Sequence, residues 1–113
     1  MVFLSIGTDI EKVSKFREKE FTKNEKFYEK IFTKNEITYC LEKIDPYPHF
    51  TARFCAKEAT IKAIENNELT LEEIEIKSNN GIPSLKLPKP FSGLISMSHT
   101  KEYAIAFVVI DKS

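Results

Sequence analysis

The sequence predicts an α+β fold in which a mainly antiparallel sheet packs against one long helix. Helical spacing dominates the first half of the chain, and strand-like alternation dominates the second half. The segment from His49 to Ile64 is the longest helical pattern. It carries a stripe of small side chains that allows another element to approach closely: Ala52, Ala56, Ala59 and Ala63. Helices followed by strands, in that order, indicate an α+β domain.

The start of the chain reads as a strand and two helices. Val2 to Ile6 is β-branched and aromatic, and the break Gly7-Thr8-Asp9 after it predicts that Asp9 lies at the end of a strand. Helical spacing then continues from Glu11 to Lys19 and from Phe21 to Phe32.

Clear boundary signals frame the next two helices. Thr33-Lys34-Asn35-Glu36 matches a capping box, in which the threonine and glutamate satisfy each other's backbone amides. This predicts a helix from about Lys34 to Lys43, which Asp45-Pro46-Tyr47-Pro48 ends before the long helix begins.

Strands follow the long helix. Ile74 to Lys77 and Leu85 to Leu87 alternate with period two on either side of Asn80-Gly81, which is a strong hairpin signal. After a loop from Pro88 to Gly93, two last strands are expected at Leu94–Ser98 and Tyr103–Ile110.

Length and composition narrow the class of protein. With 113 residues, 42% of them hydrophobic, residues 1–113 are expected to form a single domain. The 17 basic and 17 acidic residues balance, which argues against nucleic-acid binding. No segment reaches the ~20 apolar residues of a membrane span, so we expect no membrane partner and a cytoplasmic location. Cys40 and Cys55 lack metal-site spacing and are expected to be reduced and buried.

Several polar residues admit two interpretations. Glu58 and Lys62 are spaced as a surface ion pair worth about 0.3–0.5 kcal/mol. Asp9 suits the cap of a helix that begins near Glu11, and His99 suits a turn. Arg53 and Lys57 read as solvated helix charges.

The functional interpretation joins the same acids and lysine in one site. Two carboxylates, Asp9 and Glu58, can share a hard divalent cation such as Mg²⁺, which often leaves its other positions to water and substrate phosphates. Lys62 would then neutralise charge on those phosphates. The three residues together suggest metal-assisted phosphoryl-type transfer, although such trios are common.

Three blocks of sequence make the functional interpretation more specific. They are Ile6-Gly7-Thr8-Asp9-Ile10, Arg53-Phe54-Cys55-Ala56-Lys57-Glu58-Ala59 with Lys62, and Ile95-Ser96-Met97-Ser98-His99-Thr100-Lys101-Glu102-Tyr103-Ala104. In this order and at this length, the chain resembles the holo-acyl-carrier-protein synthase family, the small bacterial 4′-phosphopantetheinyl transferases. The resemblance extends from Ile6 to Ile110 and implies a 4′-phosphopantetheinyl transferase-like fold.

The resemblance also implies roles for individual residues. Asp9 and Glu58 match the magnesium ligands, and Lys62 matches the lysine beside the pyrophosphate. The family's coenzyme A contacts match Arg53, Lys62, Gly81, Pro83, His99 and Thr100. In the family these residues come from two neighbouring subunits of a homotrimer, so the active site is expected at the interface.

The implied reaction serves fatty acid biosynthesis. The 4′-phosphopantetheine group of coenzyme A would pass to a serine of apo-acyl carrier protein, with release of adenosine 3′,5′-bisphosphate. The general base stays open, with Glu58 as one choice. Two alternatives remain: a non-catalytic coenzyme A or carrier-protein binding module, and a metal-dependent phosphohydrolase.

The chain departs from the family pattern in two places. Glu65-Asn66-Asn67 stands where many relatives have glycines, which puts phosphate contacts there in doubt. Lys15 and Lys26 stand where relatives have carrier-docking arginines, and lysine lacks the bidentate fork of arginine. A local basic face at Lys12, Lys15 and Lys19 is nevertheless expected to attract an acidic carrier.

Overall fold

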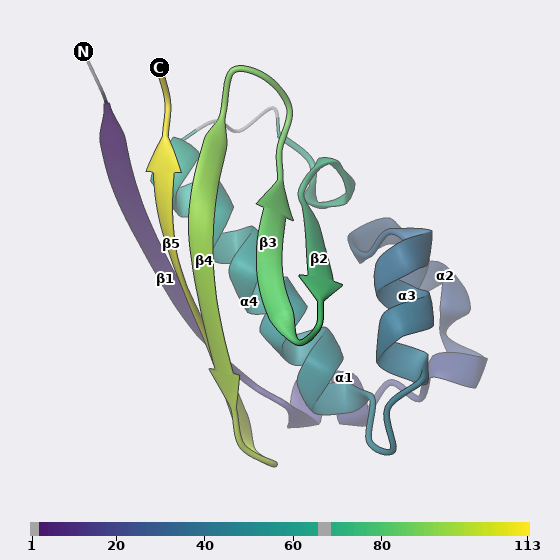
Figure 1. Cartoon of the computed structure of the whole chain (residues 1–113). Helices are drawn as coiled ribbons and strands as arrows, with labels where there is room; N and C mark the ends of the chain where they lie inside the picture. Colours follow the sequence, from purple (N-terminus) through teal and green to yellow (C-terminus); the bar gives the residue numbers. More distant parts are fainter. Residues whose placement is uncertain (1–2, 66–68) are drawn as a thin grey trace.

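The computed structural model describes residues 3–65 and 69–113, and it confirms the α+β fold class. Figure 1 shows a strand layer in front of a long helix, with the shorter helices at one side. The elements in chain order are β1 (Leu4–Lys12), α1 (Ser14–Arg17), a 3₁₀ turn (Phe21–Lys23), α2 (Glu25–Ile31), α3 (Lys34–Leu41), α4 (Tyr47–Ile64), a second 3₁₀ turn (Leu71–Glu73), β2 (Glu75–Asn79), β3 (Ile82–Lys86), β4 (Ser92–His99) and β5 (Tyr103–Asp111).

The strands form two antiparallel units. β5 lies between β1 and β4 in a three-stranded sheet, and β2 pairs with β3 in a separate hairpin beside β4. Asn80 and Gly81 turn the hairpin with positive φ values of 52° and 79°, as the Asn-Gly signal predicted. The predicted strands of the second half are therefore confirmed, with ends that differ by up to three residues.

The face of the sheet toward α4 carries small side chains where the two layers meet. The four alanines of the predicted stripe are buried, as are Ala104 and Ala106 of β5. Gly7 of β1 lies so close to α4 that an added Cβ would overlap the carbonyl oxygen of Ala59 and lie 3.2 Å from the Cβ of Ala63. The sheet and the helix therefore approach backbone to backbone.

This close approach corrects the prediction for the first strand. Gly7-Thr8-Asp9 does not end the strand, because Gly7 serves packing there and β1 continues to Lys12. Asp9 consequently lies within a strand, opposite Ala106, and caps no helix. The predicted helix at Glu11–Lys19 shortens to α1, and the helix at Phe21–Phe32 divides into a 3₁₀ turn and α2.

A second core lies between α4 and the shorter helices. Its fully buried rings include Tyr28, Phe32 and Phe50, and the ring centroids of Tyr28 and Phe50 are 4.7 Å apart. The predicted capping box holds α3 in place, since Thr33 accepts from the Glu36 amide and Glu36 accepts from the Thr33 amide. Cys40 and Cys55 are free and buried, and burial raises the pKa of each thiol to about 12.

Within residues 3–65 and 69–113, no helix has both the length and the apolar character needed to cross a bilayer. The departure predicted at Glu65-Asn66-Asn67 falls partly outside the described residues, which include Glu65 alone of the three.

Candidate active site

The junction of β1 and α4 brings three of the predicted residues together. Odd-numbered residues of β1 face α4, so Asp9 points toward the helix, while Ile6 and Ile10 on the other face are exposed. Lys62, near the end of α4, donates to Asp9 Oδ1 at 3.0 Å and to the Thr8 carbonyl oxygen at 3.2 Å. Asp9 and Lys62 are thus adjacent although they belong to different elements.

Glu58 belongs to the same group. The hydrogen bond that the Lys62 ammonium donates to Asp9 is the main cause of the raised pKa of Lys62. The negative charges of Glu58 and Glu11 raise this pKa further. Among the described residues the ion pair of Lys62 is with Asp9. The interpretation of Glu58 and Lys62 as an isolated surface pair is therefore wrong.

Glu11 is a further acidic residue of this site that the sequence interpretation placed in a helix. It lies two residues beyond Asp9 on the same face of β1. Burial raises the pKa of Glu11, and the neighbouring Asp9 raises it further, whereas Lys15, 3.1 Å away, opposes the shift. The alternation of Ile6, Thr8 and Ile10 with Gly7, Asp9 and Glu11 was the available signal.

The oxygen atoms of this site fit a hard cation. Asp9 Oδ2 is buried without a hydrogen-bond partner, while Oδ1 faces the ammonium of Lys62 as its counter-charge. Over the described part of the chain, no three histidine, cysteine or acidic side chains converge into a metal cage. Asp9 and Glu58 are the residues that could supply the one or two carboxylates that Mg²⁺ typically takes from a protein.

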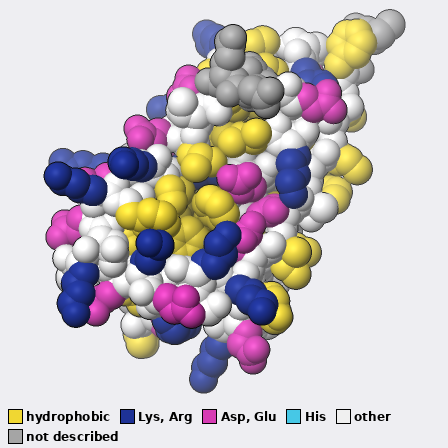
Figure 2. Space-filling model, turned by 180° about the vertical axis from the view of Figure 1, so that it is seen from behind, with side chains coloured by type: hydrophobic (Ala, Val, Ile, Leu, Met, Phe, Trp, Pro, Cys, Tyr) yellow, Lys and Arg dark blue, Asp and Glu magenta, His cyan; other side chains and the backbone are white. Residues whose placement is uncertain are grey.

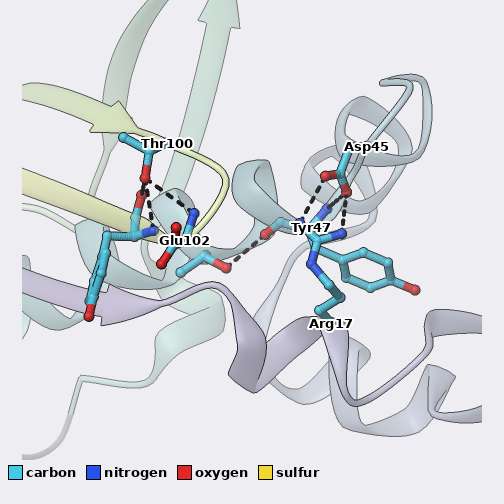
Figure 3. Close-up of polar contacts among 7 residues, drawn as sticks. Arg17, Asp45, Tyr47, Thr100 and Glu102 are labelled. Carbon is cyan, nitrogen blue, oxygen red and sulfur yellow. Dashed lines mark hydrogen bonds and ion pairs between the residues drawn. The ribbon is translucent and has the colours of Figure 1, made fainter.

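His99 and Thr100 lie at the far end of β4, beside the start of α4. They border an open cleft of about 610 Å³ together with residues of the segment that precedes α4. The Thr100 hydroxyl accepts from the Glu102 and Tyr103 amides at 3.2 and 3.1 Å, which fixes the turn between β4 and β5 (Figure 3). Their predicted position at a strand junction is confirmed.

Two charges of α4 are buried rather than solvated, which corrects the interpretation of Arg53 and Lys57. Lys57 is 0% exposed and donates to Glu36 Oε1 at 2.7 Å and to the carbonyl oxygens of Leu71 and Ile74. Arg53 is 3% exposed, and its guanidinium lies 4.0 Å from the ring centre of Tyr39. Lys57 therefore links α4 to α3 and to the segment that leads into β2.

Gly81 and Pro83 lie in the β2–β3 hairpin, apart from the acidic site. The turn of this hairpin and the end of β4 point toward the same end of the molecule, where α4 begins (Figure 1). Gly81 has open space around the position of a Cβ. The predicted residues other than the buried Arg53 thus occupy three places in the chain: the β1–α4 junction, the cleft at His99, and the hairpin.

Comparisons with known proteins identify the family of this chain. The 4′-phosphopantetheinyl transferase superfamily model, named ACPS, matches residues 5–108. A holo-[acyl-carrier-protein] synthase from Thermodesulfovibrio yellowstonii is 44% identical over 93% of this chain and 96% of its own length. One from Chloroherpeton thalassium is 37% identical over 96% of this chain and 98% of its own length.

Solved structures show the same fold. A holo-(acyl-carrier-protein) synthase from Bacillus anthracis, in complex with CoA (3′,5′-ADP), matches with a TM-score of 0.86 and 29% identity over the whole of both chains. The Helicobacter pylori enzyme in complex with coenzyme A matches with a TM-score of 0.82 and 28% identity, over 93% of this chain and 98% of that one. The resemblance found in the sequence is therefore confirmed, and the chain belongs to the 4′-phosphopantetheinyl transferase superfamily.

Proposed function

We propose that this protein is an enzyme that transfers the 4′-phosphopantetheine group of coenzyme A to a serine of apo-acyl carrier protein, with release of adenosine 3′,5′-bisphosphate. The synthase relatives and the coenzyme A complexes of similar structures support this function. The observation that carries it is the ion pair of Asp9 with Lys62 at the β1–α4 junction, one helical turn after Glu58 on α4. These are the residues that the sequence motifs matched to the family's reaction.

Asp9 and Glu58 are proposed to hold Mg²⁺. When bound, this ion would polarise the phosphate of coenzyme A that the serine attacks. The buried, unpartnered Oδ2 of Asp9 supports the assignment.

Lys62 is proposed to stabilise the charge that grows toward the leaving group. Its side chain is 57% exposed, so the ammonium can leave Asp9 and follow a phosphate. Its raised pKa keeps it protonated at neutral pH. A fixed positive charge beside the leaving phosphate lowers the energy of the transition state more than that of the bound substrate.

The remaining coenzyme A contacts are proposed at His99, Thr100, Arg53 and the hairpin residues Gly81 and Pro83. His99 and Thr100 border the open cleft directly. Arg53 is buried behind Tyr39, so its charge acts on a phosphate from within the protein rather than from the surface. Asn80-Gly81 forms the turn in any case, and Gly81 leaves room for a ligand.

We also propose a homotrimer whose active sites lie between subunits. The face of the sheet away from α4 is apolar and exposed, which is unusual for a protein that stays monomeric. The relative exposures of Ile6, Ile10 and Leu94 are 64%, 61% and 75%. The sheets of two further copies, arranged about a threefold axis, are the occupants that would bury these side chains.

An acidic carrier protein is proposed to dock near α1 and α2. Figure 2 shows the face on which these helices lie, where apolar side chains gather at the centre and both basic and acidic side chains lie around them. The predicted helical stripe is only partly present, since Lys12 belongs to β1 and Lys19 follows α1. Lys15 and Lys19 instead lie over the rings of Phe54 and Phe27.

Mass spectrometry of apo-acyl carrier protein, incubated with coenzyme A, Mg²⁺ and this protein, tests the function. We expect the carrier to gain one phosphopantetheine. Coenzyme A binding without a gain would favour the non-catalytic module, and phosphate release without a carrier would favour the phosphohydrolase.

We also propose that residues 1–113 form a single domain and that the protein is located in the cytoplasm.

A further inference from the structure

The chain has two histidines, and they lie together. His49 comes from the first turn of α4 and His99 from the last position of β4. Their ring centroids are 4.8 Å apart, and the rings meet edge to face at 68°. His49 is half-buried and His99 is exposed, so an incoming ligand meets His99 first and His49 behind it.

Both imidazoles border the open cleft of about 610 Å³ at this end of the molecule. Titratable and charged groups lie around His49 on the elements packed against it. They are Lys43 and Glu42 after α3, Asp45 in the following loop, Arg53 on α4, His99 on β4 and Lys101 in the turn after β4, and the ring centroid of Tyr39 on α3 lies 6.3 Å from that of His49.

The balance of these charges favours an anion. Asp45 is already paired with Arg17, which donates to both carboxylate oxygens at 3.2 and 2.9 Å (Figure 3). Lys43 and Lys101 then border the cleft with one remaining carboxylate, that of Glu42, and the buried Arg53 adds its positive charge from outside the lining. A phosphate group would compensate this positive excess.

Arg53 adds an observation that is independent of the cleft lining. It is 3% exposed, and its Nε is buried without a hydrogen-bond partner. Arg53 is therefore a buried cation with a hydrogen-bond donor to spare, and its positive charge contributes to lowering the pKa of His49.

We propose that His49 is a further binding residue for a phosphate group of coenzyme A, and that its imidazole takes up a proton from solvent as the phosphate enters the cleft. The proposal rests on the proposed function, since it takes coenzyme A as the ligand. It adds a residue that the family motifs did not identify, and it makes the affinity depend on pH.

The electrostatics of the free protein support the proton uptake. Burial lowers the pKa of His49 to about 4, and the positive charges of His99, Arg53 and Lys43 contribute to this shift. The ring is therefore neutral at pH 7 in the free protein. A phosphate beside it stabilises the protonated ring, so binding raises the pKa. Protons and ligand then bind cooperatively, and the affinity rises as the pH falls.

The size of the effect follows from linkage. If binding raises the pKa of His49 from about 4 to ~6, coenzyme A binds ~4-fold more tightly at pH 5.5 than at pH 7.5 through this group. The phosphates of coenzyme A titrate in the same range, but they do so equally with every variant of the protein. The comparison between variants isolates the contribution of His49.

Proton NMR of the full-length protein tests the proposal directly, because only two imidazole signals need to be assigned. His49→Phe, which keeps an aromatic ring at this position, identifies the His49 signal by its loss. We expect the pKa of His49 to rise by at least ~1 unit when coenzyme A is added. Titration calorimetry of the same samples establishes that coenzyme A is bound.

The variants supply a second readout. Calorimetry from pH 5.5 to 7.5 should show a steeper rise of affinity toward low pH in the unmodified protein than in His49→Phe. Lys89→Gln, which removes an exposed lysine outside the cleft, should behave as the unmodified protein. Binding with an unchanged His49 pKa, or with the same pH dependence in His49→Phe, would overturn this inference alone. Failure to bind coenzyme A at any pH would overturn the proposed function as well.

Discussion

Lys57 and Glu58 are neighbours on α4 with opposite environments. Lys57 is fully buried and bonded to Glu36, whose second oxygen accepts from the Ile76 amide at 2.8 Å. Desolvation lowers the pKa of Lys57, and the carboxylate of Glu36 opposes the shift, so the ion pair is needed to keep the charge buried. Glu58, one residue later, belongs to the acidic site. The same turn of α4 therefore carries a residue that stabilises the fold, Lys57, and a residue of the acidic site, Glu58.

Removal of the Lys57 charge should therefore lower the stability of the fold. Lys57→Met leaves the carboxylate of Glu36 buried without its cation, and we expect the free energy of unfolding to fall by about 3–5 kcal/mol. Urea denaturation measures this change. The same substitution at Lys62, which is 57% exposed, is the matched control and should cost less than about 1 kcal/mol. Equal losses at the two positions would contradict the structural role of Lys57.

At the scale of elements, the contact between β1 and α4 builds the site. Gly7 allows this contact, and Asp9 two residues later then faces the helix that carries Glu58 and Lys62. A side chain at position 7 would push the strand away from Ala59 and so move Asp9 from Lys62. The packing of Gly7 against α4 therefore determines where the Asp9 carboxylate lies.

Gly7→Ala is expected to lower the free energy of unfolding by about 1–3 kcal/mol or more, because the new Cβ overlaps the Ala59 backbone. Gly81→Ala is the comparison: it meets open space and costs only the ~1 kcal/mol of a left-handed backbone. Thermal and urea unfolding of both variants measure the difference. A Gly7→Ala protein as stable as Gly81→Ala would show that the strand and helix do not meet as described.

Local signals explain which elements could be predicted from the sequence. The capping box at Thr33, the alanine stripe of α4 and the Asn-Gly turn each depend on neighbouring residues, and all three were found. The extension of β1 was missed because the role of Gly7 depends on a helix far along the chain. The same reason applies to Lys57, whose burial requires Glu36 from another helix.

The candidate site was predicted in part. Motif resemblance indicated Asp9, Glu58 and Lys62, and the structure pairs Asp9 with Lys62, one helical turn after Glu58. Glu11 was missed because the error in β1 assigned it to a helix, where it would not share a face with Asp9. His49 carried no motif, and its place beside His99 follows only from the packing of α4 against the sheet.

For the whole molecule, assembly is the first question. The proposed trimer buries the apolar face of the three-stranded sheet, so Ile6→Lys should reduce the mass measured by light scattering toward that of one 13.1 kDa chain. Leu41→Lys, on α3 and 44% exposed, is the control and should leave the assembly intact. An unmodified protein that runs as a monomer would contradict the trimer.

Docking of the carrier protein is the second question at this scale. The net charge of the chain is zero, so attraction of an acidic carrier depends on local groups such as Lys15 and Lys19. Salt screens such surface charges, and we expect the carrier KM to rise severalfold from low to high ionic strength. The KM for coenzyme A in the same assays shows how much salt affects the nucleotide site. A carrier KM that stays flat would rule out electrostatic docking.

The central claim is that Asp9 and Glu58 together bind a divalent ion at the β1–α4 junction. Binding of Mn²⁺ in the presence of coenzyme A, followed by the electron paramagnetic resonance signal of the free ion, tests it most directly. The account predicts binding to the unmodified protein and a loss of affinity of ~10-fold or more in both Asp9→Asn and Glu58→Gln, with the fold retained by circular dichroism. Unchanged Mn²⁺ affinity in both folded variants would contradict it.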